Sequence, residues 1–271
     1  MSGADLKQQS RHSGRTYVVT GAASGIGAAT ALSLRDQGAR VIGADLRNAD
    51  VIADLATPDG RSALVEGVTR LSGGWIDGIV ANAGGGPAET MLALNFFGAV
   101  ATLEGLRPLL AASAAPRAVC VSSVSSLGAP NRAIVEACLA LDERTAIAAG
   151  RCALEAPGEQ ALDLYGSAKH ALNRWCRRVA VQPAWSGAGI PLNVVAPGVI
   201  DTPAAAWITT NPAAQAEMAQ RTPMPTARPG RPEQIAAVLA WCVGPENALM
   251  TGQVLFVDGG LECRARGEQS W

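Results

Sequence analysis

The chain has 271 residues, of which 48% are hydrophobic and 17% are charged, and its formal net charge is −1. This composition supports a sizeable buried core and argues against disorder, and the near-zero charge leaves no basic field for a nucleic acid or an anionic membrane. Six cysteines without a C-x-x-C pair and only two histidines argue against a zinc site or a disulfide framework, so we expect no metal and a cytoplasmic location.

The N-terminus shows no targeting segment. Residues 1–14 are polar and predict a flexible tail without the apolar run of a signal peptide. No apolar stretch is long enough to cross a bilayer. We expect residues 15–271 to form a single domain.

A strand, a glycine-rich turn and a helix follow the tail. The β-branched run 16–20 predicts a buried strand, and residues 28–37 predict a helix. In the turn between them, Gly21 allows a tight bend, Gly25 lets the backbone approach a pyrophosphate, and Gly27 lets helix and strand pack closely. The helix N-terminus offers N–H groups to phosphates. The flanking strand and helix favour dinucleotide binding over a simple glycine-rich turn.

Asp45 ends the second predicted strand, residues 40–44. A carboxylate at this position can bind both ribose hydroxyls and repel a 2′-phosphate, which favours NAD over NADP. Arg47 favours the opposite choice, because a nearby arginine can accept a 2′-phosphate. We expect NAD, since Asp45 occupies the end of the strand.

The link to the third predicted strand, residues 51–53, is too short for a helical crossover. We therefore expect that the helix between these strands is missing. Asp54 follows, and it either faces an adenine ring or caps the helix predicted over residues 58–71.

The fourth predicted strand, residues 76–80, runs into Asn82-Ala83-Gly84. Turns of small residues at the carboxyl ends of strands are where doubly wound sheets bind ligands. Residues 91–113 predict a long helix that contains Asn95 and Gly98, two residues that weaken a helix interior. They are either a harmless defect or a local opening of the helix.

The middle of the chain carries the strongest candidate for chemistry. The fifth predicted strand, residues 118–121, runs into Ser122-Ser123, and an insertion over residues 129–163 includes an extra helix predicted at 133–150. The next predicted helix extends to about Trp185 and carries the sequence Tyr165-Gly166-Ser167-Ala168-Lys169.

Tyr165 and Lys169 are four residues apart, so they lie on one face of this helix. An ammonium beside a phenol favours the phenolate, and we expect Lys169 to lower the pKa of Tyr165 and make it a general acid/base. An isolated pair of this kind is more often part of a solvated helix face, so the hypothesis depends on the other motifs.

The C-terminal part completes the sheet and supplies a loop. The last two predicted strands are residues 192–195, which end at Pro197-Gly198, and residues 254–257. Between them, residues 201–229 predict short helices in a substrate loop or lid, before a helix over 231–242. Trp207 in this loop either covers an apolar substrate or packs the loop.

Together these motifs resemble those of the short-chain dehydrogenase/reductase family. The glycine turn, Asn82-Ala83-Gly84, the pair of Tyr165 and Lys169, and the Pro197–Thr202 segment follow in the family's order. The resemblance implies an α/β fold with a doubly wound parallel sheet (Rossmann fold) in three layers. The short link before Asp54 and the insertion after Ser123 resemble the branch that contains bacterial 3α-hydroxysteroid dehydrogenase/carbonyl reductases.

The resemblance implies hydride transfer between NAD(H) and a secondary alcohol or ketone, such as a hydroxysteroid or another cyclic or aromatic apolar alcohol. In this interpretation Tyr165 transfers the proton and Ser123 binds the substrate oxygen. Lys169 binds the nicotinamide ribose, and Asn95 holds a water that links Lys169 to solvent. Ser122 is the alternative to Ser123. Two other functions remain open: an NADPH-dependent carbonyl reductase that uses Arg47, and an inactive dinucleotide-binding sensor or scaffold.

The implied cofactor-binding residues are Gly21, Ser24, Gly25, Ile26, Gly27, Asp45, Leu46, Asp54, Leu55, Asn82, Ala83, Gly84, Tyr165, Lys169, Pro197, Gly198, Ile200 and Thr202. The implied substrate-binding residues are Ser123 and Trp207. Members of the family are usually tetramers or dimers, and the insertion would cover a surface that the common tetramer uses. We therefore expect a homodimer through residues 231–257, with a tetramer as the alternative.

Overall fold

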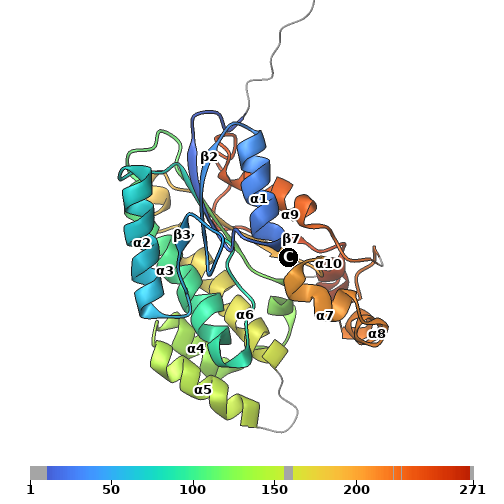
Figure 1. The fold of residues 1–271 in the computed structure, drawn as a ribbon. Coiled ribbons are helices and arrows are strands. Elements are labelled where there is room, and N and C mark those ends of the chain that lie inside the picture. The colour runs from blue at the N-terminus through green and yellow to red at the C-terminus, as the bar shows by residue number, and fades with distance from the viewer. Residues whose placement is uncertain (1–10, 156–160, 222, 227, 269–271) are drawn as a thin grey trace, which may run out of the picture.

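The computed structural model describes residues 11–155, 161–221, 223–226 and 228–268. These residues form a parallel seven-stranded sheet in the order β3-β2-β1-β4-β5-β6-β7 (Figure 1). The strands are β1 (Thr16–Thr20), β2 (Arg40–Asp45), β3 (Val51–Ile52), β4 (Gly78–Ala81), β5 (Arg117–Val121), β6 (Leu192–Pro197) and β7 (Val254–Val257). The strand order reverses between β1 and β4, as in a doubly wound sheet.

Helices cover both faces of the sheet and give three layers, as predicted (Figure 1). On one face α1 (Gly25–Asp36) packs against α9 (Pro232–Val243). On the other lie α2 (Pro58–Ser72), α3 (Ala99–Leu106) and α6 (Ala161–Ala180). Successive side chains of a strand point to opposite faces. Val18 accordingly belongs to the apolar cluster under α2, α3 and α6, and Val19 to the cluster under α1 and α9.

The link between β2 and β3 contains no helix, which confirms the prediction from its length. Ala44 of β2 pairs directly with Val51 of β3. Helix α2 is capped by Thr57, whose Oγ1 accepts a hydrogen bond from the Gly60 N–H at 3.0 Å. The alternative in which Asp54 caps this helix is therefore wrong.

Residues 91–113 do not form one continuous α-helix, and that prediction is corrected. A π-helical segment, η2 (Ala93–Gly98), precedes α3, and a 3₁₀ turn, η3 (Arg107–Leu110), follows it. The Asn95 side chain is fully buried and bonds to the backbone of Gly85 and Met91, which stabilises the wide turn. Asn95 and Gly98 thus mark a local opening rather than a harmless defect.

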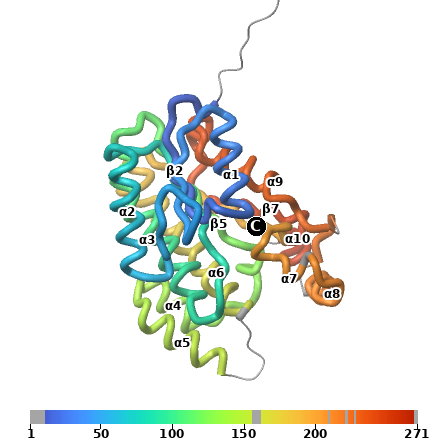
Figure 2. The backbone as a smooth tube through the Cα atoms, in the orientation of Figure 1, coloured from blue at the N-terminus to red at the C-terminus, as the bar shows by residue number. Residues whose placement is uncertain are grey.

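The insertion contains two helices rather than the single one predicted over residues 133–150. They are α4 (Arg132–Leu139) and α5 (Glu143–Glu155), which pack on each other and, through α4, on α6 (Figure 2). The break is at Leu141, which adopts a positive φ of 59°, and Asp142, whose carboxylate accepts from the Thr145 N–H. A side-chain cap of this kind starts a new helix.

Two other boundaries differ from expectation. Helix α6 ends at Ala180, and Trp185 instead lies beyond it, buried, with its indole N–H donated to Glu104 at 3.1 Å. His12, within the predicted tail of residues 1–14, is buried and hydrogen-bonded to the Tyr17 hydroxyl at 2.7 Å, so the folded part begins earlier than predicted. The rest of that tail, residues 1–10, and residues 156–160 of the insertion lie outside the described residues.

The loop after β6 carries α7 (Ala206–Thr209) and α8 (Pro212–Arg221), and α10 (Leu261–Arg266) follows β7. These helices lie beside the carboxyl edge of the sheet (Figure 1). The short helices η1 (Ala88–Thr90), η4 (Val124–Leu127), η5 (Ser186–Ala188) and η6 (Pro203–Ala205) complete the elements. Within the described part of the chain, we find no helix with the length and apolar character needed to cross a membrane.

Candidate active site

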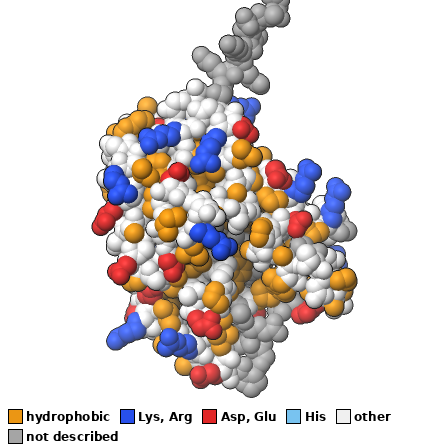
Figure 3. Space-filling view, viewed as in Figure 1, with side chains coloured by type: hydrophobic (Ala, Val, Ile, Leu, Met, Phe, Trp, Pro, Cys, Tyr) orange, Lys and Arg blue, Asp and Glu red, His pale blue; other side chains and the backbone are white. Residues whose placement is uncertain are grey.

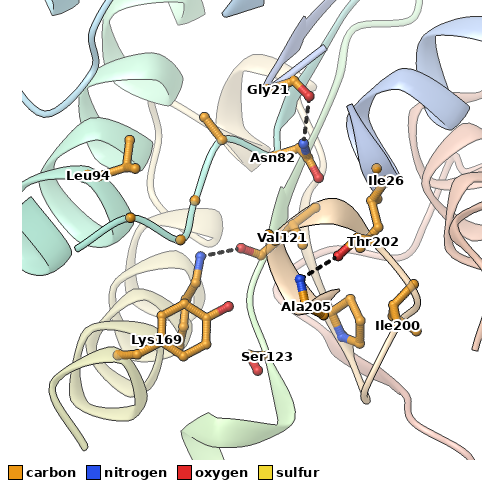
Figure 4. Close-up of a pocket in the computed structure, with 18 of the residues that line it drawn as sticks. Gly21, Ile26, Asn82, Leu94, Val121, Ser123, Lys169, Ile200, Thr202 and Ala205 are labelled. Atoms are coloured by element: carbon orange, nitrogen blue, oxygen red, sulfur yellow. Dashed lines mark hydrogen bonds between the residues drawn. The ribbon is translucent and has the colours of Figure 1, made fainter. Parts of the chain in front are cut away.

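A cavity of about 880 Å³ opens at the carboxyl ends of the strands. It forms there because the loops after β1 and β4 diverge where the strand order reverses. The glycine turn lies at one end of the site, and Lys169 and Ser123 lie at the other (Figure 4). Nearly all predicted site residues line the cavity: Gly21, Ser24, Gly25, Ile26, Asp45, Leu46, Asp54, Leu55, Asn82, Ala83, Gly84, Ser123, Tyr165, Lys169, Pro197, Gly198, Ile200, Thr202 and Trp207. Gly27 and Asn95 are not part of its lining.

The glycine turn is fastened to the loop after β4. A Cβ atom on Gly27 would lie 2.0 Å from the Gly21 carbonyl oxygen, so only glycine fits between turn and helix. The Asn82 amide donates to the Thr20 carbonyl at 2.9 Å and is directed toward Gly21 (Figure 4). The Thr20 hydroxyl accepts from the N–H groups of Asn82 and Ala83, each at 3.0 Å. Gly27 therefore acts through packing, which explains its absence from the cavity wall.

The Asp45 carboxylate is held in place at the end of β2. Its Oδ2 accepts from the Ala23 N–H at 3.0 Å, and its Oδ1 accepts from the Leu46 N–H at 2.7 Å. These bonds orient a negative charge toward the part of the cavity that Asp54 and Leu55 also line. The arrangement can accept hydrogen bonds from a ribose and disfavours a phosphate there.

The opposite end of the cavity gathers a serine, a tyrosine and a lysine. Ser123 precedes η4, and its Oγ accepts from the Ser125 N–H at 3.1 Å. The Ser123 side chain lies beside the Tyr165 hydroxyl and acts to lower the pKa of that hydroxyl. The Ser122 hydroxyl instead donates to the Lys169 backbone carbonyl at 3.4 Å. Ser123 rather than Ser122 is thus the serine beside Tyr165.

Lys169 is buried, and its Nζ donates to the Val121 carbonyl at 2.9 Å (Figure 4). The same nitrogen lies 5.5 Å from the centre of the Tyr165 ring. Burial lowers the pKa of Lys169 to about 8. An ammonium in a weakly solvated site loses its charge more readily than one in water.

The pKa of Tyr165 is raised, which corrects the expected lowering. Burial is the main cause, and the neighbouring Ser123 side chain opposes it only in part. The Lys169 ammonium lies over the ring and bonds to Val121 instead of the phenol oxygen, so the predicted effect of the lysine does not dominate. Tyr165 is accordingly a neutral phenol at neutral pH in this state.

Asn95 lies behind the cavity wall, close to Lys169. A Cβ atom on Gly84 would be 2.8 Å from the Asn95 Oδ1 and 3.4 Å from the Lys169 Nζ. The missing side chain at Gly84 therefore lets these two residues approach each other. The Asn95 amide also donates to the Gly85 carbonyl at 2.9 Å, so it shapes the loop that borders the Lys169 end of the cavity.

The remaining wall is apolar and was only partly predicted. Trp207 lines it with 53% of its surface exposed, together with Ala204, Ala205, Ile208 and Met218 of the predicted substrate loop. The lining residues that the sequence did not predict include Met91, Leu94 and Leu162. Leu162 is one helical turn before Tyr165, a spacing that could have revealed it. Met91 and Leu94 have no such local signal. In the space-filling view, hydrophobic side chains border the hollow and charges of both signs are interspersed (Figure 3).

We find no candidate metal site in the parts of the chain that the structure describes. No group of three or more His, Cys, Asp or Glu side chains there is arranged to hold an ion.

Comparison with known proteins places this geometry in a family. Residues 21–262 match the family described as enoyl-(acyl carrier protein) reductase. The chain is 34% identical to the 3-alpha-hydroxysteroid dehydrogenase/carbonyl reductase of Comamonas testosteroni, over 93% of this chain and 98% of the relative. It is 32% identical to the cis-4-hydroxycyclohexanecarboxylate dehydrogenase of Sinomonas cyclohexanicum, over 91% and 96%.

A solved structure is similar over the same length. The 3-alpha-hydroxysteroid dehydrogenase from Pseudomonas sp. B-0831, complexed with NADH, superposes with a TM-score of 0.82 at 36% identity and covers 94% of this chain and 99% of its own. The sheet order, the glycine turn and these matches lead to one conclusion. The chain belongs to the short-chain dehydrogenase/reductase family of oxidoreductases.

Proposed function

We propose that this protein transfers hydride between NAD(H) and an uncharged, apolar secondary alcohol or ketone. The observation that carries the proposal is the single cavity that joins the glycine turn and Asp45 to Ser123, Tyr165 and Lys169. A protein that only binds a dinucleotide and catalyses no reaction would not need a tyrosine, a serine and a lysine together at one end of this cavity.

The residues present fit a dinucleotide. Gly25 has a positive φ of 53° at the start of α1, so its backbone can lie close to a pyrophosphate at the helix N-terminus. Asp45 would hold the adenosine ribose, and Lys169 the nicotinamide ribose. The hydroxysteroid dehydrogenase of Pseudomonas sp. B-0831, which is 36% identical, is complexed with NADH. The nicotinamide ring supplies the hydride acceptor when an alcohol is oxidised.

The chain's own residues would handle the proton. Tyr165 first releases its own proton to solvent past Lys169 and then, as the phenolate, takes the proton of the substrate hydroxyl, while the Ser123 hydroxyl donates a hydrogen bond to the substrate oxygen as negative charge develops on it. Burial makes the Tyr165 phenolate costly, so the positive charge of Lys169 is needed to favour it at the moment of transfer. Asn95 would hold a water that links Lys169 to solvent.

The substrate end of the cavity favours an uncharged molecule. Met91, Leu94 and Leu162 form apolar parts of its wall. Lys169 is the one cation among the described lining residues, and its ammonium would be hydrogen-bonded to the nicotinamide ribose of the cofactor. The relatives act on a hydroxysteroid and on a cyclohexane hydroxy acid. We favour a neutral substrate of the hydroxysteroid kind over a hydroxy acid, because no cation other than Lys169 is found among the described lining residues to bind a carboxylate.

A panel of alcohols tests the proposal. Neutral hydroxysteroids and cycloalkanols should be oxidised with NAD at a higher kcat/KM than hydroxycyclohexanecarboxylates. Failure to bind NADH would reject the proposal. NADH binding without turnover of any alcohol or ketone would also reject it, and would support the inactive sensor or scaffold.

The choice of cofactor has its own test, since Arg47 supports the NADPH-dependent alternative. The wild type should use NAD with a higher kcat/KM than NADP. Replacing Asp45 by Ala removes the carboxylate, and we expect kcat/KM for NAD to fall roughly 10- to 100-fold, the effect of one hydrogen bond to a charged group. A wild-type preference for NADP would overturn the assignment.

We also propose a cytoplasmic homodimer formed through α9 and β7. The α4–α5 insertion packs on α6, the helix surface that the common tetramer of this family uses. All four residues of the edge strand β7 are partly exposed in the single chain, as is Trp241 of α9. A solution mass of four chains, with cross-links between α6 helices, would refute this assembly.

A further inference from the structure

The insertion makes a direct contact with the wall of the cofactor site through Arg61 and Glu143. Arg61 is the fourth residue of α2, at the end of its first turn, and its guanidinium forms a two-pronged ion pair with the Glu143 carboxylate of α5, at 2.6 and 2.7 Å. The two side chains are 13% and 28% exposed, so the pair is largely shielded from solvent. The N-terminal end of α2 is directed toward the insertion (Figure 1).

The same guanidinium also binds three backbone carbonyls. Its Nε donates to Leu55 at 2.8 Å, and its Nη2 donates to Ala93 at 2.9 Å and, more weakly, to Ala56 at 3.5 Å. Leu55 and the adjacent Asp54 line the cavity near Asp45. Ala93 begins the π-helical segment that carries Asn95. One side chain therefore connects the insertion, the loop after β3 and η2.

The position of Arg61 is electrostatically unusual. Near a helix N-terminus the dipole favours negative groups, so a cation there needs a compensating partner. Glu143 provides that charge and both of its oxygens are bonded to Arg61. Without it, a partly buried guanidinium would depend on carbonyl groups alone, and its orientation would be less restricted.

The connected segments also pack tightly. A Cβ atom on Gly98, the last residue of η2, would lie 2.8 Å from the Leu55 carbonyl oxygen. A Cβ atom on Gly150 of α5 would lie 2.8 Å from the side chain of Leu92, just before η2. A shift of the insertion would therefore be transmitted to the Leu55 loop rather than absorbed by empty space.

We propose that Glu143 and Arg61 are positioning residues for the cofactor: the insertion holds Arg61, and Arg61 fixes the Asp54–Ala56 loop against which the adenine end of NAD(H) binds. The inference rests on the proposed use of NAD(H). It gives the insertion a role in cofactor affinity, separate from any effect on assembly.

The test compares two ion pairs of the same insertion. Glu143→Gln keeps the shape of the side chain and removes its charge. Glu136→Gln is the matched control, because Glu136 also pairs with an arginine, Arg132, at 2.6 Å, but on the exposed surface of α4. Arg61→Lys is the second variant. A lysine retains the charge, but its single ammonium cannot donate at once to the Glu143 carboxylate and to the separated backbone carbonyls that the planar guanidinium reaches.

NADH binding to each full-length protein is measured directly by titration of its fluorescence, alongside thermal unfolding of the free proteins and steady-state kinetics. We expect Glu143→Gln and Arg61→Lys to raise the dissociation constant of NADH roughly three- to tenfold, in the range of coupling through a positioning contact. The kcat at saturating NAD and the KM for the alcohol should stay within about twofold of wild type, and Glu136→Gln should bind NADH as the wild type does.

Two results would overturn the inference. One is wild-type NADH affinity in both Glu143→Gln and Arg61→Lys. The other is a parallel rise in the KM for the alcohol with a fall in kcat, which would indicate general loss of structure. A wild-type protein that does not bind NADH would reject the proposed function itself, and this inference with it.

Discussion

Replacing Tyr165 by Phe is the most direct test of the proposed chemistry. The substitution removes one hydroxyl, leaves the ring in place and creates no large cavity. Loss of a general acid/base typically lowers kcat by about 10²- to 10⁴-fold. The hydroxyl also lies beside Ser123, and losing one such polar contact should lower the free energy of unfolding by only about 1 kcal/mol.

The chain offers a matched control, because Tyr17 is its only other tyrosine. Tyr17 is fully buried in β1, and its hydroxyl bonds to the His12 Nδ1 and the Arg15 Nε, each at 2.7 Å. Burial raises the pKa of Tyr17 to about 12, so it stays neutral. Tyr17→Phe leaves two polar groups without their partner and should lower the free energy of unfolding by about 1–3 kcal/mol.

The two substitutions should therefore have opposite profiles. Tyr165→Phe should lose turnover while the NADH dissociation constant and the denaturant midpoint change little. Tyr17→Phe should lose stability while kcat at a temperature well below its unfolding transition stays near the wild-type value. Steady-state kinetics, NADH titration and urea unfolding of the three proteins measure this. Residual kcat in Tyr165→Phe within tenfold of wild type would show that another group transfers the proton.

Three further predictions concern pH and packing. Burial lowers the folded-state pKa of His12, so the unfolded chain binds a proton first as the pH falls below about 6.5, and stability should decrease there; His12→Gln should abolish this part of the pH dependence in urea unfolding. Because the pKa of Lys169 is lowered to about 8, the NADH dissociation constant should rise above that pH, and a constant value through pH 9 would contradict its role. Gly27→Ala forces a Cβ to within 2.0 Å of a carbonyl oxygen and should cost at least about 1–3 kcal/mol of stability, whereas Gly187→Ala, with no atom closer than 3.5 Å, should be tolerated in the same urea assay.

The sequence predicted most of the elements because their signals are local. Alternating strands and helices, a glycine turn and a strand-end carboxylate all follow from composition and spacing within about ten residues. The short link before Asp54 was predicted correctly for the same reason, since its length alone excludes a helix. The doubly wound parallel sheet in three layers followed from the resemblance to the family.

The errors arise where distant residues decide. The helix predicted over 91–113 opens into a π-helical segment because Asn95 bonds to the loop at Gly85, a partner that periodicity does not reveal. The split of the insertion at Leu141 is a local exception, because its positive φ and the Asp142 cap on Thr145 lie within five residues of one another and were overlooked in the sequence. Arg61 gave no sequence signal, since its partner Glu143 is far away along the chain.

The sequence by itself determined that this chain forms a doubly wound sheet with a glycine turn and a helix bearing Tyr165 and Lys169. The tertiary structure decided the electrostatic state of that pair. The spacing of four residues brings the ammonium near the ring, but the degree of burial sets the direction of both pKa shifts. Desolvation depends on every segment packed around the site, and no local pattern encodes it.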